Sequence, residues 1–316
     1  MKLRTALAAL AGGAGVATVL DRLRSAPPLP PALVGEQRTY RWRGLDIGYA
    51  EAGDEADPDL LLLHGIHAAA SGQEFDRIWD SLADDYHVLA PDLPGFGRSE
   101  RPPLSYTDRT YPDFIADFAA DVTDDPIGLA SSLTGAYAAM VGSDRFERLV
   151  LICPTDDTGT RRPWLRSLFR TPVVGELLFG SLTTPASLRW WGAREGYENP
   201  AALAEAEVDY QHRSARQPGA RFAPASFIGG YLTPDRSLRS VLSEATLPVT
   251  LVWGREATRT PLAVGRGYAA AGDTGLVIVD DTRLLPHAER PAAFLRGARE
   301  SGALPALSEV DGLEAE

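Results

Sequence analysis

Short apolar runs alternate with segments of helical periodicity along most of the chain. The runs 60–64, 86–90, 127–130 and 149–153 are continuous and apolar, which is typical of strands buried on both faces of a sheet. Residues 74–82 and 111–122 repeat apolar positions at helical spacing, and 133–141 predicts a further helix. Two short strands, 38–43 and 45–52, flank Gly44 and predict a hairpin. The alternation predicts an α/β fold whose mostly parallel sheet has helices on both faces.

The alternation stops between residues 158 and 245, where the sequence is helical in character and rich in aromatic side chains. Strands resume at 249–253 and 276–279, and a closing helix follows at 291–299. We therefore expect a core of residues 34–157 and 246–300, with a helical cap, 158–245, inserted before the last two strands. Residues 1–33 are predicted to be an apolar segment and a proline-rich linker outside the fold. Residues 301–316 are predicted to be a frayed acidic tail.

The composition is that of a globular protein with enough apolar residues for a large core, since 44% of the residues are hydrophobic and 23% are charged. The charge balance is more unusual, because 43 acidic residues against 31 basic ones give a net charge of −12, and Lys2 is the sole lysine. Such a surface repels phosphate backbones, so no nucleic-acid partner is expected. An acidic, lysine-poor chain indicates either a high-salt cytoplasm or a GC-rich genome, and both interpretations stay open.

The N-terminus places positive charge before an apolar stretch. Lys2 and Arg4 precede residues 5–20, a stretch of sixteen residues that is shorter than the ~20 needed to span a membrane. The order is that of a signal peptide, but charged residues follow at once and no clear cleavage site is present. A weakly membrane-associating helix and a helix lying on the domain are the alternatives. The expected location is cytoplasmic or membrane-associated, with secretion left open.

Residues that can carry chemistry follow the predicted strands, and open α/β sheets bind ligands at the carboxyl ends of their strands. Ser132 lies between a short strand and a helix, with the small residues Ala130 and Thr134 two positions to either side. A nucleophile on a sharp turn needs small residues there, because strand and helix nearly touch. The helix start would also direct N–H groups and a positive dipole end at the site. The alternative is that Ser131 and Ser132 only cap the helix.

The segment HGIH at residues 64–67 directly follows the third predicted strand. Gly65 allows the backbone to turn, so that the N–H of Ile66 can face the same point as the N–H of Leu133. Two converging amides form an oxyanion hole. We expect His64 to be structural, whereas His67 is a candidate base or substrate contact.

Five motifs occur in one order at ordinary spacings: LLLLHG, PDLPGFGRS, ASSLTGAYAA, PVTLVWG and LPHAERP. Together they resemble the α/β-hydrolase superfamily, in its capped serine-hydrolase branch, over residues 38–300. The resemblance implies an eight-stranded sheet, a helical lid and a Ser–acid–His triad in that chain order. It places the nucleophile at Ser132. The acid position, however, is Ala257, the histidine position is Leu284, and His287 matches a second position that is usually non-catalytic.

Three interpretations follow, because a serine hydroxyl needs a base to attack efficiently. In the first, His287 takes the role of base and is oriented by Glu256, Asp156 or Asp157. In the second, His67 or water is the base. In the third, the protein is a catalytically impaired relative that uses the capped pocket to bind a ligand or to act as a scaffold.

The working hypothesis is a hydrolase of small or medium hydrophobic esters that acts through an acyl-enzyme on Ser132. The aromatic cap favours a hydrophobic ligand, and Trp190 and Trp191 are candidate contacts. No metal or other cofactor is expected, because the five histidines are scattered and Cys153 is the sole cysteine. Weak membrane association through residues 5–20 is the one further partner expected.

Overall fold

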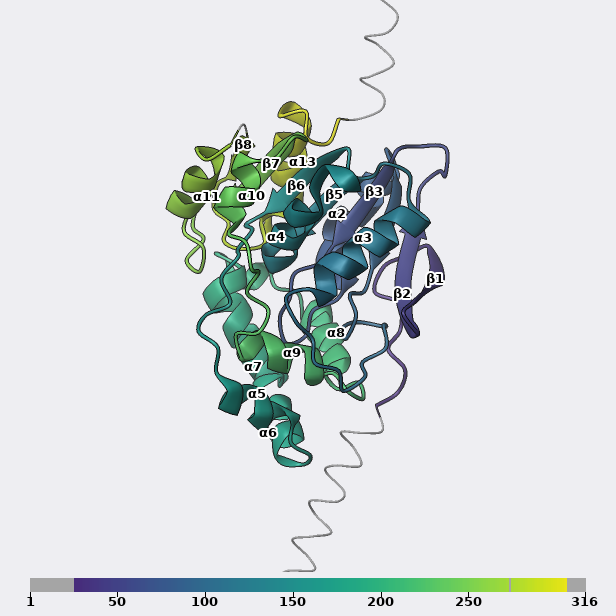
Figure 1. Ribbon diagram of the computed structural model, residues 1–316, viewed down its shortest axis with the longest axis vertical. Coiled ribbons are helices and arrows are strands. Elements are labelled where there is room, and N and C mark those ends of the chain that lie inside the picture. The colour runs from purple at the N-terminus through teal and green to yellow at the C-terminus, as the bar shows by residue number, and fades with distance from the viewer. Residues whose placement is uncertain (1–25, 273, 306–316) are drawn as a thin grey trace, which may run out of the picture.

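The computed structural model describes residues 26–272 and 274–305, and an eight-stranded sheet lies at its centre (Figure 1). The strand order is β1-β2-β4-β3-β5-β6-β7-β8. β2 is antiparallel to both β1 and β4, and all other neighbours are parallel. The predicted α/β-hydrolase fold with a mostly parallel sheet is confirmed. The strands are β1 (Glu36–Trp42), β2 (Leu45–Ala52), β3 (Asp59–Leu63), β4 (His87–Pro91), β5 (Ile127–Ser131), β6 (Arg148–Ile152), β7 (Val249–Gly254) and β8 (Thr274–Val279).

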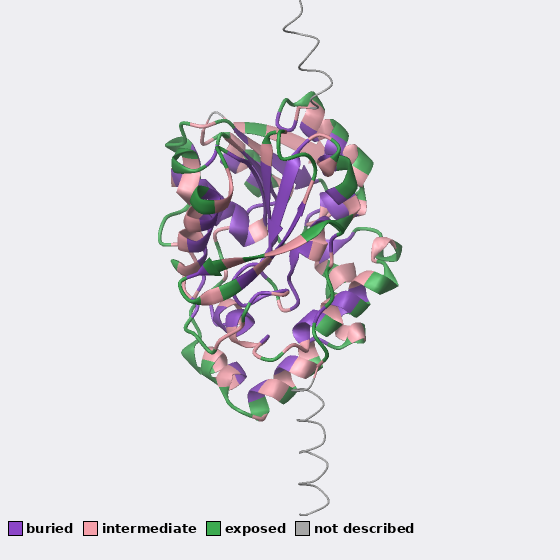
Figure 2. Cartoon of the chain, turned by 90° about the vertical axis from the view of Figure 1, so that its right-hand side faces the viewer, coloured by how far each residue is buried: buried purple, intermediate pink, exposed green. Residues whose placement is uncertain are grey.

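The central strands are buried because their sequences are apolar on both faces, and Figure 2 shows them in the interior of the molecule. In β3, four consecutive leucines have no exposed surface. Successive side chains of a strand point to opposite faces. Leu61 and Leu63 accordingly join the apolar cluster on one side of the sheet, and Leu60 and Leu62 join the cluster on the other side. The continuous apolar runs in the sequence therefore become strands that serve two cores at once.

Helices cover both faces of the sheet. The first core contains buried residues of α3, α4, α10 and α11, and the second contains buried residues of α2 and α13. The helices are α2 (Asp76–Ala83), α3 (Thr110–Val122), α4 (Ser132–Val141), α5 (Pro163–Arg170), α6 (Val174–Leu182), α7 (Pro185–Trp191), α8 (Glu205–Ala215), α9 (Phe222–Ile228), α10 (Leu238–Ser243), α11 (Leu262–Ala269), α12 (Pro286–Glu289) and α13 (Pro291–Glu300), with short turns η1 (Gly72–Phe75), η2 (Gly142–Asp144), η3 (Gly192–Gly196) and η4 (Pro200–Ala202).

Helices α5 to α9 lie between β6 and β7 in the chain, and Figure 1 shows them together at one end of the molecule. We call these helices the cap. The cap has an apolar cluster of its own, which includes Phe169, Phe179 and Leu188. The predicted cap boundary at residue 245 needs correction, because α10 contacts α4 and α11 and places Leu238 and Leu242 in the first core. Helical periodicity identifies a helix, but it does not say which core the apolar face of that helix joins.

The predicted boundaries at both termini also need correction where the structure describes them. Leu33 is buried in the second core, so residues 26–33 lie on the domain rather than outside it. At the other end, Leu304 is buried and the carbonyl of Pro305 accepts a hydrogen bond from Tyr86. The predictions for residues 1–25 and 306–316 lie outside the described residues. Within the described ranges, none of the helices is both long enough and apolar enough to cross a bilayer.

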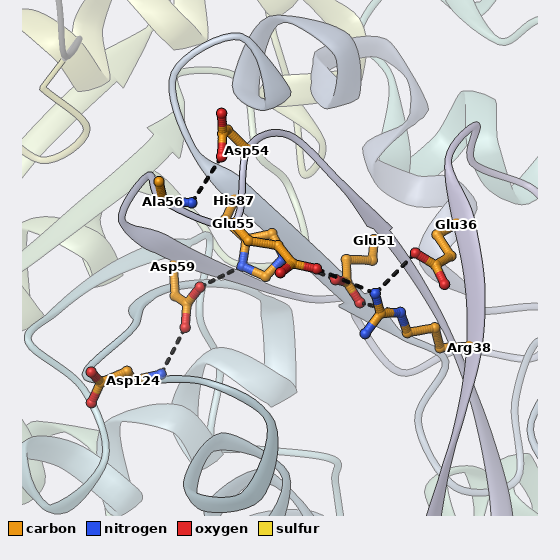
Figure 3. Close-up of polar contacts among 9 residues, drawn as sticks. All are labelled: Glu36, Arg38, Glu51, Asp54, Glu55, Ala56, Asp59, His87 and Asp124. Atoms are coloured by element: carbon orange, nitrogen blue, oxygen red, sulfur yellow. Dashed lines mark hydrogen bonds and ion pairs between the residues drawn. The ribbon is translucent and has the colours of Figure 1, made fainter.

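A polar cluster lies at the amino-terminal ends of β3 and β4, and Figure 3 shows its contacts. The ring of His87 lies between two carboxylates, with Nδ1 2.6 Å from Asp59 and Nε2 3.0 Å from Glu51. Arg38 contacts the second oxygen of Glu51 at 3.1 Å, and Asp59 also accepts the N–H of Asp124 at 2.7 Å. Partial burial by itself would lower the pKa of His87, but Asp59 and Glu51 raise it above its ordinary value. The ring of His87, on β4, therefore links the strands on either side of it, β2 and β3.

We expect His87→Ala to lower the free energy of unfolding by about 2 kcal/mol at pH 6, the size of charge-assisted hydrogen bonds to a partly buried group. Because the pKa is raised on folding, this stabilisation is complete below the unfolded value near 6.5 and is lost as pH rises through the folded value. Urea unfolding at pH 6 and pH 9 measures the difference. His212→Ala is the control, since that ring contacts a carbonyl, Thr183 O, rather than a carboxylate. An equal cost of His87→Ala at both pH values would contradict the prediction.

Candidate active site

Ser132 occupies a strained turn between β5 and α4. Its φ angle is +54°, a left-handed conformation that L-residues other than asparagine and aspartate seldom adopt. The side chain of Ser131, the N-cap residue of α4, makes no capping hydrogen bond, so the alternative of a simple capping pair is not what the structure shows. Ser131 and Leu133 are buried, whereas Ser132 is partly exposed. The turn therefore directs this one hydroxyl away from the core.

Small residues allow the strand and the helix to cross closely at this turn. A Cβ atom on Gly135 would lie 3.3 Å from the carbonyl oxygen of Ala130 and 3.2 Å from the side chain of Pro154. Thr134 is fully buried, and its hydroxyl donates a hydrogen bond of 2.8 Å to the carbonyl of His64. The hydroxyl of Thr134 thus ties the helix to the loop that follows β3, which a glycine at that position could not do.

The loop after β3 lies against the turn at Ser132. A Cβ atom on Gly65 would be 3.4 Å from Cβ of Ser132 and 3.5 Å from Oγ of Ser131, so glycine permits this contact. Ile66 follows Gly65, and Leu133 lies in the first turn of α4, where backbone N–H groups have no intrahelical acceptor. The structure brings together the loop and the turn that were predicted to supply the two amides.

The buried carboxylate of Glu74 fixes the loop after β3 through a hydrogen bond to its backbone. Its Oε2 accepts the N–H of Gly65 at 2.9 Å, and its Oε1 lies 3.4 Å from Nε2 of His287. That second distance suits an ion pair but is long for a hydrogen bond. Within the described residues, Glu74 Oε1, Ser131 Oγ and both ring nitrogens of His287 have no hydrogen-bond partner. Buried polar atoms without partners are rare in proteins, and here four lie in one place beside the turn.

The electrostatics of this cluster, Glu74, His287 and Ser131, favour a charged carboxylate. Burial by itself would raise the pKa of Glu74, but the imidazole of His287, the hydroxyl of Ser131 and the N–H of Gly65 lower it to about 2. Glu74 is therefore ionised throughout the physiological pH range. We call these three side chains the buried polar unit.

His287 has no exposed surface and lies between two phenylalanine rings. Its centroid is 5.5 Å from that of Phe75 and 5.8 Å from that of Phe294, and both rings belong to the core shared with α2 and α13. No hydrogen bond joins His287 to Ser132 among the residues that the structure describes. The ring is therefore placed to interact with Glu74, behind the loop, rather than with the hydroxyl of Ser132.

The three acids predicted to orient His287 are elsewhere, and this expectation is corrected. Asp156 accepts hydrogen bonds from Leu238 N–H at 2.6 Å and Tyr268 O–H at 3.0 Å. Asp157 is exposed and accepts the N–H of Gly159. Glu256 is exposed in the loop after β7. The carboxylate that faces His287 is instead Glu74, which comes from a distant part of the chain.

The two positions that the resemblance assigns to the acid and the histidine, Ala257 and Leu284, lie in the apolar interior. Ala257 belongs to the first core, with 7% of its surface exposed, and Leu284 packs against the same core. Arg283, the residue before Leu284, donates hydrogen bonds to the carbonyls of Ala193 and Arg194 in the cap, both at 2.9 Å. This end of the sheet therefore provides apolar packing and a link to the cap.

Of the remaining candidates, His67 and Trp190 line two clefts between core and cap. His64 is structural in its contacts, with Nε2 accepting the N–H of Leu93 at 3.0 Å. His67 and Glu74 line a small polar cleft of about 110 Å³ that also includes Tyr197 and Glu207 of the cap region. Trp190 lines a more open cleft of about 780 Å³ with three arginines, Arg194, Arg259 and Arg283. Ser132 lines neither cleft. Trp191 packs edge-to-face on Trp190 at 4.7 Å.

Glu74 is the residue that sequence reasoning missed. It stands at the start of a predicted helix, where an acidic residue is common because it complements the helix dipole. Nothing local distinguishes a buried glutamate at such a position from an exposed one. The described residues contain no cluster of three histidine, cysteine, aspartate or glutamate side chains suited to a metal ion.

Comparison with known proteins places this geometry in a wider context. A model of the alpha/beta hydrolase family matches residues 60–296. An uncharacterized hydrolase, YugF of Bacillus subtilis, is 23% identical over 80% of this chain and 93% of its own length. Two other curated relatives are matched over only 20% and 18% of their own lengths.

Solved structures resemble the fold over almost the whole chain. A membrane phospholipase A, described as a bacterial virulence factor, has a TM-score of 0.67 with 24% identity and covers 96% of this chain and 98% of its own. The esterase RhEst1 of a Rhodococcus species has a TM-score of 0.63 with 21% identity and covers 84% of this chain and 97% of its own. At these identities the likeness concerns the fold.

We expect Glu74→Gln to lower the free energy of unfolding by about 2 kcal/mol at pH 6, because a charged acceptor is replaced by a neutral one in a buried site. The pKa of Glu74 is lowered on folding, so its stabilisation is complete above the unfolded value near 4.3 and is lost as pH falls toward about 2. Urea unfolding between pH 6 and pH 3 measures the difference in free energy of unfolding between wild type and variant, which should shrink as pH falls. Glu256→Gln, at an exposed carboxylate, is the matched control and should change little. A gap that stays constant with pH would show that the charge of Glu74 is not what stabilises the site.

Proposed function

Since the chain belongs to the alpha/beta hydrolase family, we propose that it hydrolyses small or medium hydrophobic esters through an acyl-enzyme on Ser132. The observation that carries this proposal is the strained φ of +54° at Ser132, at the start of α4 and against the loop of Gly65. A non-glycine residue in such a conformation costs about 1–2 kcal/mol, and strain of this kind gathers at functional sites. The partly exposed hydroxyl supports the role of nucleophile.

In the proposed reaction, Oγ of Ser132 attacks the ester carbonyl carbon, and the carbonyl oxygen becomes an oxyanion held by the N–H groups of Ile66 and Leu133. The carbon–oxygen bond to the alcohol then breaks, the alkoxide takes a proton from water and leaves, and the acyl group stays on Ser132. Water attacks the acyl-enzyme and releases the acid. The buried polar unit contributes by fixing Gly65, through Glu74, and hence the direction of the Ile66 amide.

The base is the unusual part of the proposal. Because Ala257 and Leu284 are apolar and His287 faces Glu74, none of these three positions supplies a base to Ser132. We therefore assign that proton to water or hydroxide. Without a positioned base, serine enzymes lose several orders of magnitude in rate and keep the part that comes from the oxyanion hole. Esters with good leaving groups should consequently be the best substrates.

The cap and the names of two structures with a similar fold support the proposed substrate class. Both structural neighbours described above, a phospholipase and an esterase, are named for ester substrates. His67 lies beside the oxyanion loop and Trp190 lines the wider cleft, so we retain both as substrate contacts. Trp191, packed on Trp190, would support it from outside.

We expect a fluorophosphonate probe to label wild type at a single residue and not to label Ser132→Ala, because the probe reports a nucleophilic serine in an oxyanion site. Ser131→Ala is the matched control, since it removes the neighbouring hydroxyl, leaves Ser132 in place and should still be labelled. Mass spectrometry of the labelled peptide identifies the modified residue. Labelling of Ser132→Ala, or a probe adduct on Ser131, would overturn the assignment.

We also expect the rate of p-nitrophenyl ester hydrolysis to rise about tenfold per pH unit between pH 6 and 9 without a plateau, as for a hydroxyl without a positioned base. A stopped assay across this range measures the profile in wild type and His287→Asn. A plateau above pH 7 that disappears in His287→Asn would instead make His287 the base and contradict the proton route given above.

The second candidate is a ligand-binding or scaffold protein that keeps the fold without turnover. The specific observation in its favour is that apolar side chains, Ala257 and Leu284, fill the positions of the acid and the histidine. The labelling experiment separates the two functions. A folded wild-type protein that resists the probe at both low and high salt would favour the binding function.

A further inference from the structure

Large exposed apolar side chains gather on the cap. The described part of the chain has eight of them, and five lie on three consecutive cap helices: Trp164 on α5, Val174 and Leu177 on α6, and Trp190 and Trp191 on α7. Trp164 is 66% exposed and Trp190 is 54% exposed. Scattered single apolar residues are normal on a protein surface, but a concentration on one substructure marks an interaction site.

These side chains are not needed to hold the cap together. The helices α5, α6 and α7 already bury other residues, Phe169, Phe179 and Leu188, in the cap's own cluster. Val174 and Leu177 are three residues apart, so they lie on the same outer face of α6. Helix α6 contacts both α5 and α7, and Figure 1 shows α5 and α6 at the end of the molecule away from the sheet. Trp190, at the end of α7, lines the cleft toward the core and Trp191 packs on it. We therefore call only the exposed side chains of α5 and α6, Trp164, Val174 and Leu177, the apolar cap surface.

The charge of the same segment is opposite to that of the protein. Residues 158–200 contain six arginines and three glutamates, a net charge of +3, whereas the whole chain carries −12. Tryptophan and arginine side chains are suited to the boundary between water and lipid, because each combines an apolar body with a polar tip. Apolar insertion together with a positive charge is the combination that binds anionic lipid surfaces.

The described chain also begins on the cap side. The carbonyl of Pro27 accepts a hydrogen bond from Gln217 at 2.9 Å, and the carbonyl of Pro30 accepts one from Tyr210 of α8 at 3.0 Å. The sequence that precedes residue 26, with its apolar residues 5–20, therefore starts from the same end of the molecule as the cap.

We propose that the apolar cap surface docks on a lipid bilayer that contains anionic lipids. Trp164 and the apolar residues of α6 enter the headgroup region, and the exposed Arg161 and Arg162 just before α5 face lipid phosphates. The docked orientation turns the cap toward the membrane and the acidic core away from it. This proposal goes beyond the hydrolytic function and does not depend on it, because binding to lipid requires no turnover.

Sedimentation of the full-length protein with phosphatidylcholine vesicles, with and without phosphatidylglycerol, tests the proposal. We expect wild type to bind the anionic vesicles and its tryptophan fluorescence to shift to shorter wavelength. Trp164→Ser combined with Leu177→Ser should weaken binding by about tenfold or more, since both side chains lose their apolar contact with lipid. The matched control is Val34→Ser combined with Val264→Ser. These changes remove exposed apolar residues that lie outside the cap, so this variant should bind like wild type.

A second variant distinguishes vesicle binding by the cap from vesicle binding by the N-terminal sequence. Leu7→Asp combined with Leu10→Asp disrupts the apolar stretch and should leave a cap-dependent part of the binding. If the cap variant binds vesicles as tightly as wild type, residues 5–20 account for the binding and the proposal is overturned. It is also overturned if wild type ignores vesicles but forms oligomers that the cap variant does not, since the surface would then serve a protein partner. Equal melting temperatures of all variants show that the fold is unchanged.

Discussion

The close crossing of β5 and α4 is the constraint on which the site depends. The chain must reverse direction between Ala130 and Gly135 with no room for larger side chains, and it does so by taking a left-handed conformation at Ser132. Such a residue is stable only when its surroundings determine it completely. Here those surroundings are the loop at Gly65 and the hydroxyl of Thr134, so the same packing that strains the serine also fixes the loop beside it.

The buried polar unit explains how that loop keeps its place. An ionised glutamate is costly to bury, and it is retained only where charged or polar neighbours compensate for lost water. Glu74 has such neighbours in His287 and in the N–H of Gly65. In the proposed reaction this histidine therefore stabilises the geometry of the oxyanion hole, and the proton of the nucleophile leaves by way of solvent.

The proposed membrane surface gives the charge distribution a common explanation. Most of the protein is acidic, which keeps it dispersed in water and repels anionic surfaces. The cap is the exception, with excess arginine and exposed tryptophan. A protein with these two ends would approach an anionic bilayer in one orientation, with the cap between the sheet and the lipid.

The sequence alone determined the alternation of strands and helices and the position of the turn at Ser132, because both are encoded by neighbouring residues whose spacing reflects local geometry. The eight-stranded sheet was implied by the resemblance of its motifs to α/β-hydrolases. Only the tertiary structure decided that His287 meets Glu74 rather than Asp156, and that α10 joins the main core rather than the cap. Those outcomes depend on which distant segments pack together, and a contact between residues far apart in the chain leaves no periodic pattern in either segment. The sheet was therefore predictable from the sequence, while the partners of the buried charges were not.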